Sequence, residues 1–324
     1  MENLEWTEDY KPGWWLRFGH INTIFSAMSR RIDDVAYLRE RFELSDGDFV
    51  DLDWSRQGSK KLVIALHGLE GNAQRPYIKG MIRYFNANKW DAMGLNFRGC
   101  SGEPNRKVVT YHMSKIDDLA EVVEKIAGVG NYQTIVLVGF SLGGSVLLNY
   151  LGRMAGQLPK ALKGGVAISV PVDLVPSVKE IGSLKNRAYV LRFLNTLNPK
   201  MAKKIHLFPD QLSVPEKWPK TLEAFDDYFT SKIHGFDGAL DYWTKSSALQ
   251  YLNRINLPCL LINAQDDSFL SEGCFPLDIV QQNENFHLLA PKYGGHCGFA
   301  GATNEKGVLW SEQMTFKFVN KYVP

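Results

Sequence analysis

Three features that mark other classes of protein are scarce or missing in this sequence. Only four cysteines occur among its 324 residues (Cys100, Cys259, Cys274 and Cys297), and no two of them form a Cys-x-x-Cys pair. This spacing argues against a disulfide framework or a zinc site and predicts reduced thiols. The longest uncharged apolar runs, such as Thr134–Phe140, have the length of a strand. They fall far short of the ~20 residues that cross a bilayer, so we expect no transmembrane segment.

An excess of charge of one sign is also missing. The sequence has 37 Lys and Arg against 35 Asp and Glu, a net charge of +2. Nucleic-acid-binding proteins usually carry a strong basic excess, so we expect no nucleic-acid partner. The first residues include Glu2, Glu5, Glu8 and Asp9, whereas a signal peptide begins with positive charge. These observations predict a cytoplasmic protein.

Strand-like runs alternate with helix-length amphipathic segments from Ser45 onward. The expected strands are Phe49–Trp54, Leu62–Leu66, Trp90–Phe97, Thr134–Phe140, Gly165–Val170 and Cys259–Ala264. The expected helices are Pro76–Asn88, Ile116–Ala127, Leu142–Met154 and Val308–Tyr322. The first strand alternates as a half-exposed strand does, and the later ones are continuously apolar. This pattern predicts an α/β fold with a mostly parallel, twisted sheet and helices on both faces.

Residues 1–44 form an extension rich in aromatic residues before this alternation begins. Four apolar residues recur there at helical spacing: Ile21, Ile24, Phe25 and Met28. We expect their stripe to pack a helix against the body of the protein, because such stripes usually serve cores. The alternative is a lid or a membrane-surface helix, since exposed tryptophans beside Arg30 and Arg31 would suit an interface.

Residues 171–257 interrupt the alternation, because they contain no convincing strand. Between Leu174 and Lys220 there are nine Lys and Arg against three acidic residues. We interpret residues 171–257 as a helical cap inserted over the carboxyl edge of the sheet, with residues 1–170 and 258–324 forming the core. The positive charge is expected to face solvent; attraction to an anionic lipid or substrate is the alternative.

The sequence Gly139-Phe140-Ser141-Leu142-Gly143 fits G-x-S-x-G between an expected strand and an expected helix. This setting is that of a nucleophile elbow, in which a serine sits on a sharp strained turn. Glycines are needed there because strand and helix approach closely. Ser141 is therefore the candidate nucleophile, and a structural helix-capping serine is the alternative.

A serine nucleophile needs a base, and in this architecture the histidine comes last in the chain. Four histidines follow Ser141: His206, His234, His287 and His296. His296 lies in a glycine-rich loop after the apolar run Phe286–Ala290, from which it could reach over the sheet edge. His287 lies inside that run and the other two lie in the expected cap. His296 is therefore the candidate base.

The acid that orients the histidine should follow the strand before it. Cys259–Ala264 leads into Asp266 and Asp267, and adjacent side chains point in different directions. We choose Asp267 over Asp266, which would then form a turn. Asp173, after the strand Gly165–Val170, is the outside candidate.

An oxyanion in such a site needs preorganised N–H donors. The backbone N–H of Leu142, at the start of the helix after Ser141, is the first candidate. The second candidate is the N–H of Leu69, in the loop His67-Gly68-Leu69-Glu70-Gly71. His67 precedes the serine in the chain and is interpreted as a support for this loop.

The sequence resembles the YheT-like branch of the α/β-hydrolases along nearly its whole length. The blocks that carry the resemblance are His20–Thr23, Asp46–Asp48, Asp53-Trp54, His67–Gly71, Arg75–Tyr77, Asn96–Arg106, Tyr111-His112, the elbow, His234–Phe236, Asp266-Asp267 and Gly294–His296. The resemblance implies an α/β-hydrolase core with the triad Ser141, Asp267 and His296, in agreement with the spacing argument.

These features predict a serine hydrolase that cleaves carboxylic esters through an acyl-enzyme, without a metal or organic cofactor. The expected cap contains many apolar residues, which suits a small-molecule ester with an apolar acyl group: Tyr189, Val190, Phe193, Leu194 and Leu197. Two alternatives stay open. One is acyl transfer on the same triad, and the other is a non-catalytic ligand-binding protein with this fold.

Overall fold

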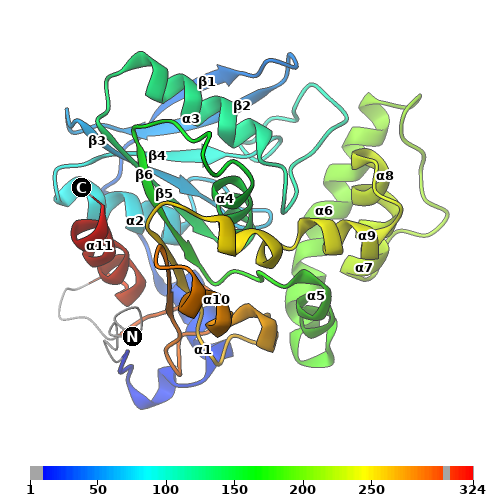
Figure 1. Cartoon of the computed structure of the whole chain (residues 1–324). Coiled ribbons are helices and arrows are strands. Elements are labelled where there is room, and N and C mark those ends of the chain that lie inside the picture. Colours follow the sequence, from blue (N-terminus) through cyan, green and yellow to red (C-terminus); the bar gives the residue numbers. More distant parts are fainter. Residues whose placement is uncertain (1–9, 302–306, 324) are drawn as a thin grey trace.

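An eight-stranded sheet forms the centre of the computed structural model, which describes residues 10–301 and 307–323 (Figure 1). Its strand order is β1-β2-β4-β3-β5-β6-β7-β8. The strands are β1 (Leu38–Glu43), β2 (Phe49–Ser55), β3 (Lys61–Leu66), β4 (Asp91–Asn96), β5 (Thr134–Phe140), β6 (Leu162–Ile168), β7 (Cys259–Ile262) and β8 (Phe286–Leu289). The pairs β1–β2 and β2–β4 are antiparallel, and all other pairs are parallel. The predicted mostly parallel sheet is confirmed.

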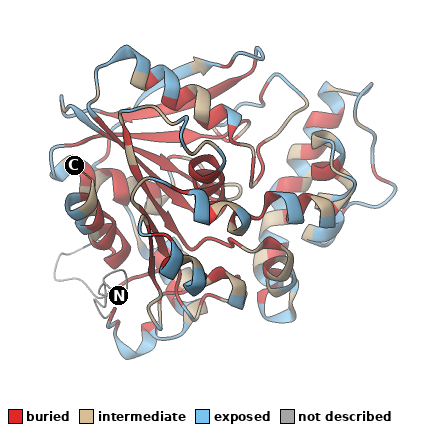
Figure 2. Cartoon of the chain, viewed as in Figure 1, coloured by how far each residue is buried: buried red, intermediate tan, exposed pale blue. Residues whose placement is uncertain are grey.

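Helices cover both faces of the sheet, as the alternation predicts. On one face lie α3 (Asp117–Val129), α4 (Leu142–Arg153) and α10 (Leu277–Gln282). On the other lie α2 (Pro76–Ala87) and α11 (Trp310–Tyr322). Successive side chains of a strand point to opposite faces, so both faces of the central strands carry apolar residues. Figure 2 shows the result, a buried sheet between two helical layers.

The expectation that β2 is half-exposed is wrong, because every residue of β2 is buried. The edge strand β1, which the sequence pattern did not reveal, covers its polar side chains. Arg39 of β1 forms a bidentate ion pair with Asp53 (2.7 and 2.8 Å), and Arg41 forms another with Asp51 (2.9 and 3.1 Å). Paired charges explain how two aspartates can be buried in a strand.

Helix α1 (Gly19–Ser29) packs with the face opposite to the one expected. Its buried residues are Asn22 and Ser26, whereas the four apolar residues of its stripe are 38–77% exposed. The backbone of the loop before residue 302 explains this reversal. Asn22 Oδ1 accepts a hydrogen bond from the Ala300 N–H (3.1 Å), and Ser26 Oγ donates one to the Gly298 carbonyl (3.0 Å). Buried backbone groups need partners, and here the polar face of α1 supplies them.

Arg98 lies in the block Asn96–Arg106, which follows β4 and carries part of the family resemblance, and its contacts give this block a structural role. Its side chain is 2% exposed and forms a bidentate ion pair with Asp118 of α3 (2.7 Å for both bonds). It also donates to Asp46 (2.7 Å) and Asp48 (3.0 Å) in the β1–β2 turn. Through these ion pairs the arginine ties the turn to the helical layer. Removal of any one partner would leave an uncompensated buried charge.

The segment between β6 and β7 is helical. It contains α5 (Leu174–Gly182), η3 (Leu184–Asn186), α6 (Arg187–Leu207), α7 (Leu222–Phe225), η4 (Asp226–Thr230), α8 (Ser231–His234), α9 (Ala239–Ser246) and η5 (Ala248–Arg254). Most of these helices lie to the right of the sheet in Figure 1. Helices α5, α6, α7 and η4 share a hydrophobic cluster that is separate from the two clusters on the faces of the sheet, and it includes Val190, Leu194, Leu197 and Phe229.

A partly buried carboxylate inside this helical segment predicts a pH effect on stability. Asp226 accepts hydrogen bonds from Trp243 Nε1 (2.9 Å) and Thr230 Oγ1 (2.8 Å), and burial raises its pKa to about 6. The folded state therefore binds a proton that the unfolded chain releases near its ordinary pKa of about 4. The contribution of Asp226 to the free energy of unfolding thus falls as pH rises through this window.

We expect Asp226→Asn to remove this loss, because an amide can keep both hydrogen bonds and does not ionise. The stability of the variant relative to wild type should rise by about 2 kcal/mol between about pH 4.5 and pH 7. Urea unfolding of both proteins across that range measures the difference. A difference that does not change with pH would contradict the assignment.

Candidate active site

Ser141 occupies a strained turn between β5 and α4. Its backbone has φ of +51° and ψ of −119°, a conformation that non-glycine residues rarely adopt. The flanking glycines are required by contact. A Cβ on Gly139 would lie 2.5 Å from the Gly143 carbonyl oxygen, and one on Gly143 would lie 2.5 Å from the carbonyl oxygen of Leu66 at the end of β3. The turn therefore presents the serine at the carboxyl edge of the sheet.

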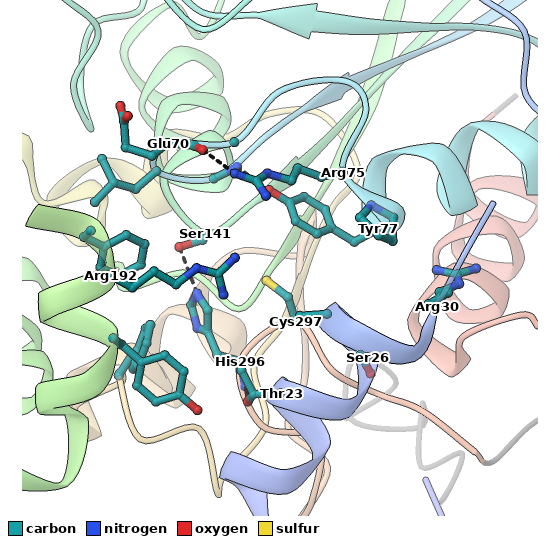
Figure 3. Close-up of a pocket in the computed structure, with 18 of the residues that line it drawn as sticks. Thr23, Ser26, Arg30, Glu70, Arg75, Tyr77, Ser141, Arg192, His296 and Cys297 are labelled. Atoms are coloured by element: carbon teal, nitrogen blue, oxygen red, sulfur yellow. Dashed lines mark hydrogen bonds between the residues drawn. The ribbon is translucent and has the colours of Figure 1, made fainter. Parts of the chain in front are cut away.

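His296 reaches this serine from the loop that follows β8. Its Nε2 lies 3.0 Å from Ser141 Oγ, and its Nδ1 lies 2.8 Å from Asp267 Oδ2 (Figure 3 shows the serine contact). The Asp267 side chain is fully buried and the His296 side chain is 13% exposed. Because an ionised carboxylate only accepts hydrogen bonds, Nδ1 carries the proton and Nε2 is free to accept one from the hydroxyl.

The three candidate acids have separate positions. Asp267 contacts His296 and also accepts a hydrogen bond from the Phe269 N–H (3.0 Å). Asp266 instead accepts one from the Gly295 N–H (2.8 Å), and burial together with the neighbouring Asp267 raises its pKa to about 6. It therefore holds the loop that carries the histidine. Asp173, the outside candidate, is the N-cap residue of α5.

Helix α1 also supports the histidine loop. Thr23 Oγ1 accepts a hydrogen bond from the His296 N–H (2.8 Å). Gly295 packs so closely that a Cβ would lie 2.2 Å from the Gly19 carbonyl oxygen. The segment His20–Thr23, one of the blocks that carry the family resemblance, thus lies beside the loop that carries His296, and Thr23 holds that loop in place. The sequence alone did not reveal this role.

The loop after β3 passes beside Ser141, and most of its backbone N–H groups donate hydrogen bonds. The Gly68 N–H donates to Tyr77 Oη (3.1 Å), the Glu70 N–H to Tyr111 Oη (2.9 Å), and the Gly71 N–H to the Gly68 carbonyl (3.0 Å). Glu70 adopts a φ of +53°. Tyr111 Oη donates back to Glu70 Oε1 (2.7 Å), so one tyrosine holds both the backbone and the side chain of this residue.

A lysine from the helical segment completes this support. Lys200 of α6 donates to Glu70 Oε1 (2.6 Å), so the loop is tied to α6 by an ion pair. His67 lies beneath the loop: its Nδ1 bonds the Gly68 carbonyl (2.7 Å) and its Nε2 accepts from the Phe97 N–H (3.2 Å). Burial lowers the pKa of His67 to about 3, so it is a neutral support and not a base at ordinary pH.

The other histidines after Ser141 have positions away from the serine. His287 lies in β8 and is 3% exposed, packed near Phe318 and Tyr322. His234 Nε2 lies 3.0 Å from Thr110 Oγ1. His206 lies in the last turn of α6.

A pocket opens beside Ser141 and His296. Its walls come from α1, the loop at residues 68–71, the start of α2, helix α6 and Phe269. Tyr189 and Phe193 of α6 line it, as expected, whereas Val190, Leu194 and Leu197 lie in the core of the helical segment. These three residues occupy the inner face of α6 and hold it to its neighbours, so only part of the apolar content of this segment faces the pocket.

The sequence did not identify the polar residues that line this pocket. Arg75, Arg192 and Tyr77 line it and lie around the serine in Figure 3. Arg75 donates to the Glu70 carbonyl (2.8 Å). Arg75-Pro76-Tyr77 is one of the family-like blocks, which was a usable signal, but nothing local distinguishes Arg192 from other basic residues of its helix. Within residues 10–301 and 307–323, no cluster of three or more His, Cys, Asp or Glu side chains is arranged to hold a metal.

The described part of the chain, residues 10–301 and 307–323, holds no helix that is both long enough and apolar enough to span a bilayer.

Comparison with known proteins places this architecture in a family. Residues 61–294 match the sequence profile described as alpha/beta hydrolase fold. The chain is 31% identical to the Escherichia coli protein named "Putative esterase YheT", over 94% of this chain and 91% of that protein. It is 27% identical to human phospholipase ABHD3, over 96% of this chain and 76% of that protein.

A solved structure shows the same fold. An esterase from Pyrococcus furiosus superposes with a TM-score of 0.61 at 18% identity, covering 91% of this chain and 97% of that one. At this identity the likeness concerns the fold alone. Taken with the matched profile and the relative of near-equal length, it shows that the chain belongs to the α/β-hydrolase family, on the branch that includes YheT.

Proposed function

We propose that this protein is a serine hydrolase that cleaves carboxylic esters. The observation that carries the proposal is the continuous contact from Ser141 Oγ to His296 Nε2 (3.0 Å) and from His296 Nδ1 to Asp267 Oδ2 (2.8 Å). These distances lie within the range that proton transfer requires. Relatives named as an esterase and a phospholipase support the same class of reaction.

In the proposed mechanism, Ser141 attacks the ester carbonyl while His296 takes the hydroxyl proton. Asp267 holds the imidazole in the reactive tautomer and stabilises the imidazolium. His296 then passes the proton to the leaving alcohol, which leaves an acyl-enzyme. Water, activated by the same histidine, then attacks the acyl group. The bond between the acyl carbon and Ser141 Oγ breaks, the carboxylic acid leaves, and His296 returns the proton to the serine. Every proton in this cycle moves between groups of this chain, the substrate and water.

Two backbone N–H groups are proposed to stabilise the tetrahedral oxyanion. The Leu142 N–H lies at the start of α4, where the first amides of a helix have no partner within the helix. The Leu69 N–H lies in the loop whose neighbouring amides, at Gly68 and Glu70, already donate to tyrosines. A preorganised pair of donors at this place would stabilise charge as it develops.

The pocket supports a substrate with an apolar acyl group. Three aromatic residues line the pocket beside the histidine: Tyr189, Phe193 and Phe269. The centroid of the Phe269 ring lies 5.0 Å from that of Tyr189 and 4.3 Å from that of His296. We propose residues 171–257 as the cap, because α6 from this segment forms one wall. Aromatic walls around a polar reaction centre suit an acyl chain next to an ester carbonyl.

Labelling with a fluorophosphonate probe tests the proposal, because the probe reacts with an activated serine. We expect rapid labelling of wild type and none of Ser141→Ala. A series of p-nitrophenyl esters of increasing acyl length then measures which chains the pocket accepts. A well-folded wild-type protein that neither labels nor hydrolyses any ester would contradict the proposal and favour a binding protein.

Tyr111 is expected to act as a positioning residue for the proposed oxyanion loop. Tyr111→Phe removes the acceptor for the Glu70 N–H and the donor to the Glu70 carboxylate. Because small displacements of oxyanion donors weaken transition-state binding, kcat should fall roughly 10- to 100-fold while KM changes little. Steady-state kinetics on a soluble ester separates the two parameters.

Tyr132→Phe is the matched control. Its hydroxyl also donates to a carboxylate, Asp91 Oδ2 (2.7 Å), but at the opposite edge of the sheet, where β4 begins. It should leave kcat unchanged. Equal losses in both variants would mean that Tyr111 contributes only to general stability.

A further inference from the structure

The outward face of α1 and the turn before it carry a contiguous apolar surface. We define the α1 patch by six residues that are 38–77% exposed: Trp14, Phe18, Ile21, Ile24, Phe25 and Met28. Trp15 packs on Phe25 with ring centroids 4.8 Å apart. Along α1 these exposed residues alternate with the buried Asn22 and Ser26, so they lie on one face of the helix, which is at the lower part of Figure 2. Apolar groups gathered in this way usually mark an interaction site.

The fold itself does not require these residues to be apolar. Helix α1 is held by its polar face, through Asn22, Thr23 and Ser26, which bond the histidine loop and its surroundings. Polar side chains on the outward face would leave all of these bonds intact. The hydrogen bonds that hold α1 therefore do not account for the apolar residues on its outward face.

The surroundings of the patch are basic. Residues 10–34 contain four basic residues, Lys11, Arg17, Arg30 and Arg31, against two acidic residues, Asp33 and Asp34. Arg30 pairs with Glu312 (2.6 Å), whereas Arg31 is exposed. The neighbouring helix α6 contains five Lys and Arg and no acidic residue. Lys200 pairs with Glu70 and Lys204 is buried, which leaves Arg187, Arg192 and Lys203. Two leucines nearby are exposed as well, Leu184 of η3 by 86% and Leu191 of α6 by 48%.

Helices α1 and α6 meet at the mouth of the pocket. His20 Nδ1 lies 3.2 Å from Tyr189 Oη, and the two rings are stacked. Both helices line the cavity that contains Ser141, α1 through Thr23, Ser26 and Ala27 and α6 through residues such as Phe193. A surface that contacts the α1 patch would therefore lie beside the entrance to the pocket.

We propose that the α1 patch docks on an anionic phospholipid membrane. Tryptophan and phenylalanine suit the boundary between headgroups and acyl chains, and flanking lysines and arginines suit anionic headgroups. Docking of a second copy through the same patch would bring the basic residues of both copies together, and like charges oppose such contact. The inference concerns binding, and it goes beyond the proposed hydrolase activity.

Sedimentation with vesicles of phosphatidylcholine alone, or mixed equally with phosphatidylglycerol, tests the proposal. We expect the full chain to bind the anionic vesicles more tightly and to release them as salt rises. Trp14→Ser combined with Met28→Ser should weaken binding at least roughly tenfold, because two large apolar side chains no longer enter the interface. Neither residue lines the pocket, so kcat/KM for a soluble short-chain ester should not change.

Leu38→Ser combined with Val129→Ser is the matched control. Leu38 and Val129 are 67% and 59% exposed and lie on β1 and α3, across the molecule from α1 in Figure 1. This variant should bind vesicles as wild type does. Three results would overturn the proposal: no binding by wild type, an equal loss in the control, or a dimer that the patch variant converts to monomers. Repeating the assay with Ser141→Ala keeps the result independent of any hydrolysis.

Discussion

Ser141→Ala is expected to lower kcat for ester hydrolysis roughly 10⁴- to 10⁶-fold, with the fold unchanged. The loss is large because the serine and histidine act as a unit, and without the hydroxyl only binding and the proposed oxyanion donors remain. The substitution removes one oxygen from a residue at the strained turn, whose hydroxyl contacts His296. Burst-phase and steady-state kinetics on a p-nitrophenyl ester measure the effect.

Ser145→Ala provides a matched control one turn along α4. Ser145 is 1% exposed, and its hydroxyl has no hydrogen-bond partner among the described residues. Its removal should leave kcat unchanged. Should Ser141→Ala retain more than about a tenth of wild-type activity, far above the residual rate of triad variants, a different nucleophile would be required.

Asp267→Asn is expected to lower kcat roughly 10⁴-fold. An asparagine can donate a hydrogen bond to Nδ1, which places the imidazole proton on Nε2 and prevents it from accepting the serine proton. It also removes the charge that stabilises the imidazolium. The change keeps the shape of a side chain that is fully buried, so thermal unfolding should show a folded protein.

Asp266→Asn separates the two adjacent aspartates by function. Its side chain accepts from the Gly295 N–H, a bond that an amide oxygen can also accept. We expect a change in kcat of less than roughly tenfold, because the histidine loop keeps this support. If Asp266→Asn instead lost as much activity as Asp267→Asn, the assignment of the acid would be wrong.

The local signals of this sequence were most informative where the backbone itself imposes the residue type. Glycine is required at positions 139 and 143, because a Cβ on either residue would lie less than 3 Å from backbone atoms. The glycine spacing around Ser141 therefore predicted a turn that the structure contains. Continuous apolar runs also predicted buried parallel strands correctly, because a strand that is covered on both faces, such as β5, needs apolar residues at every position. Edge strand β1 gave no such signal, because its exposed residues are mostly charged.

Helix α1 illustrates the opposite case. Its period is helical and the structure contains the helix, but periodicity does not say which face meets the protein. The backbone of the loop at residues 294–300 needed polar partners, and Asn22 and Ser26 supplied them. The choice between Asp266 and Asp267 was of the same kind, because it depends on the direction of side chains in a turn.

Sequence patterns were enough to predict most of the buried strands, several of the helices beside them, the turn that carries Ser141, and the histidine and aspartates that could serve it. These follow from short-range sterics and burial, which neighbouring residues specify. Only the tertiary structure decided which aspartate reaches His296, which face of α1 is exposed, and that Arg75 and Arg192 join the pocket. Such features depend on contacts between segments far apart in the chain, and local spacing carries no information about them.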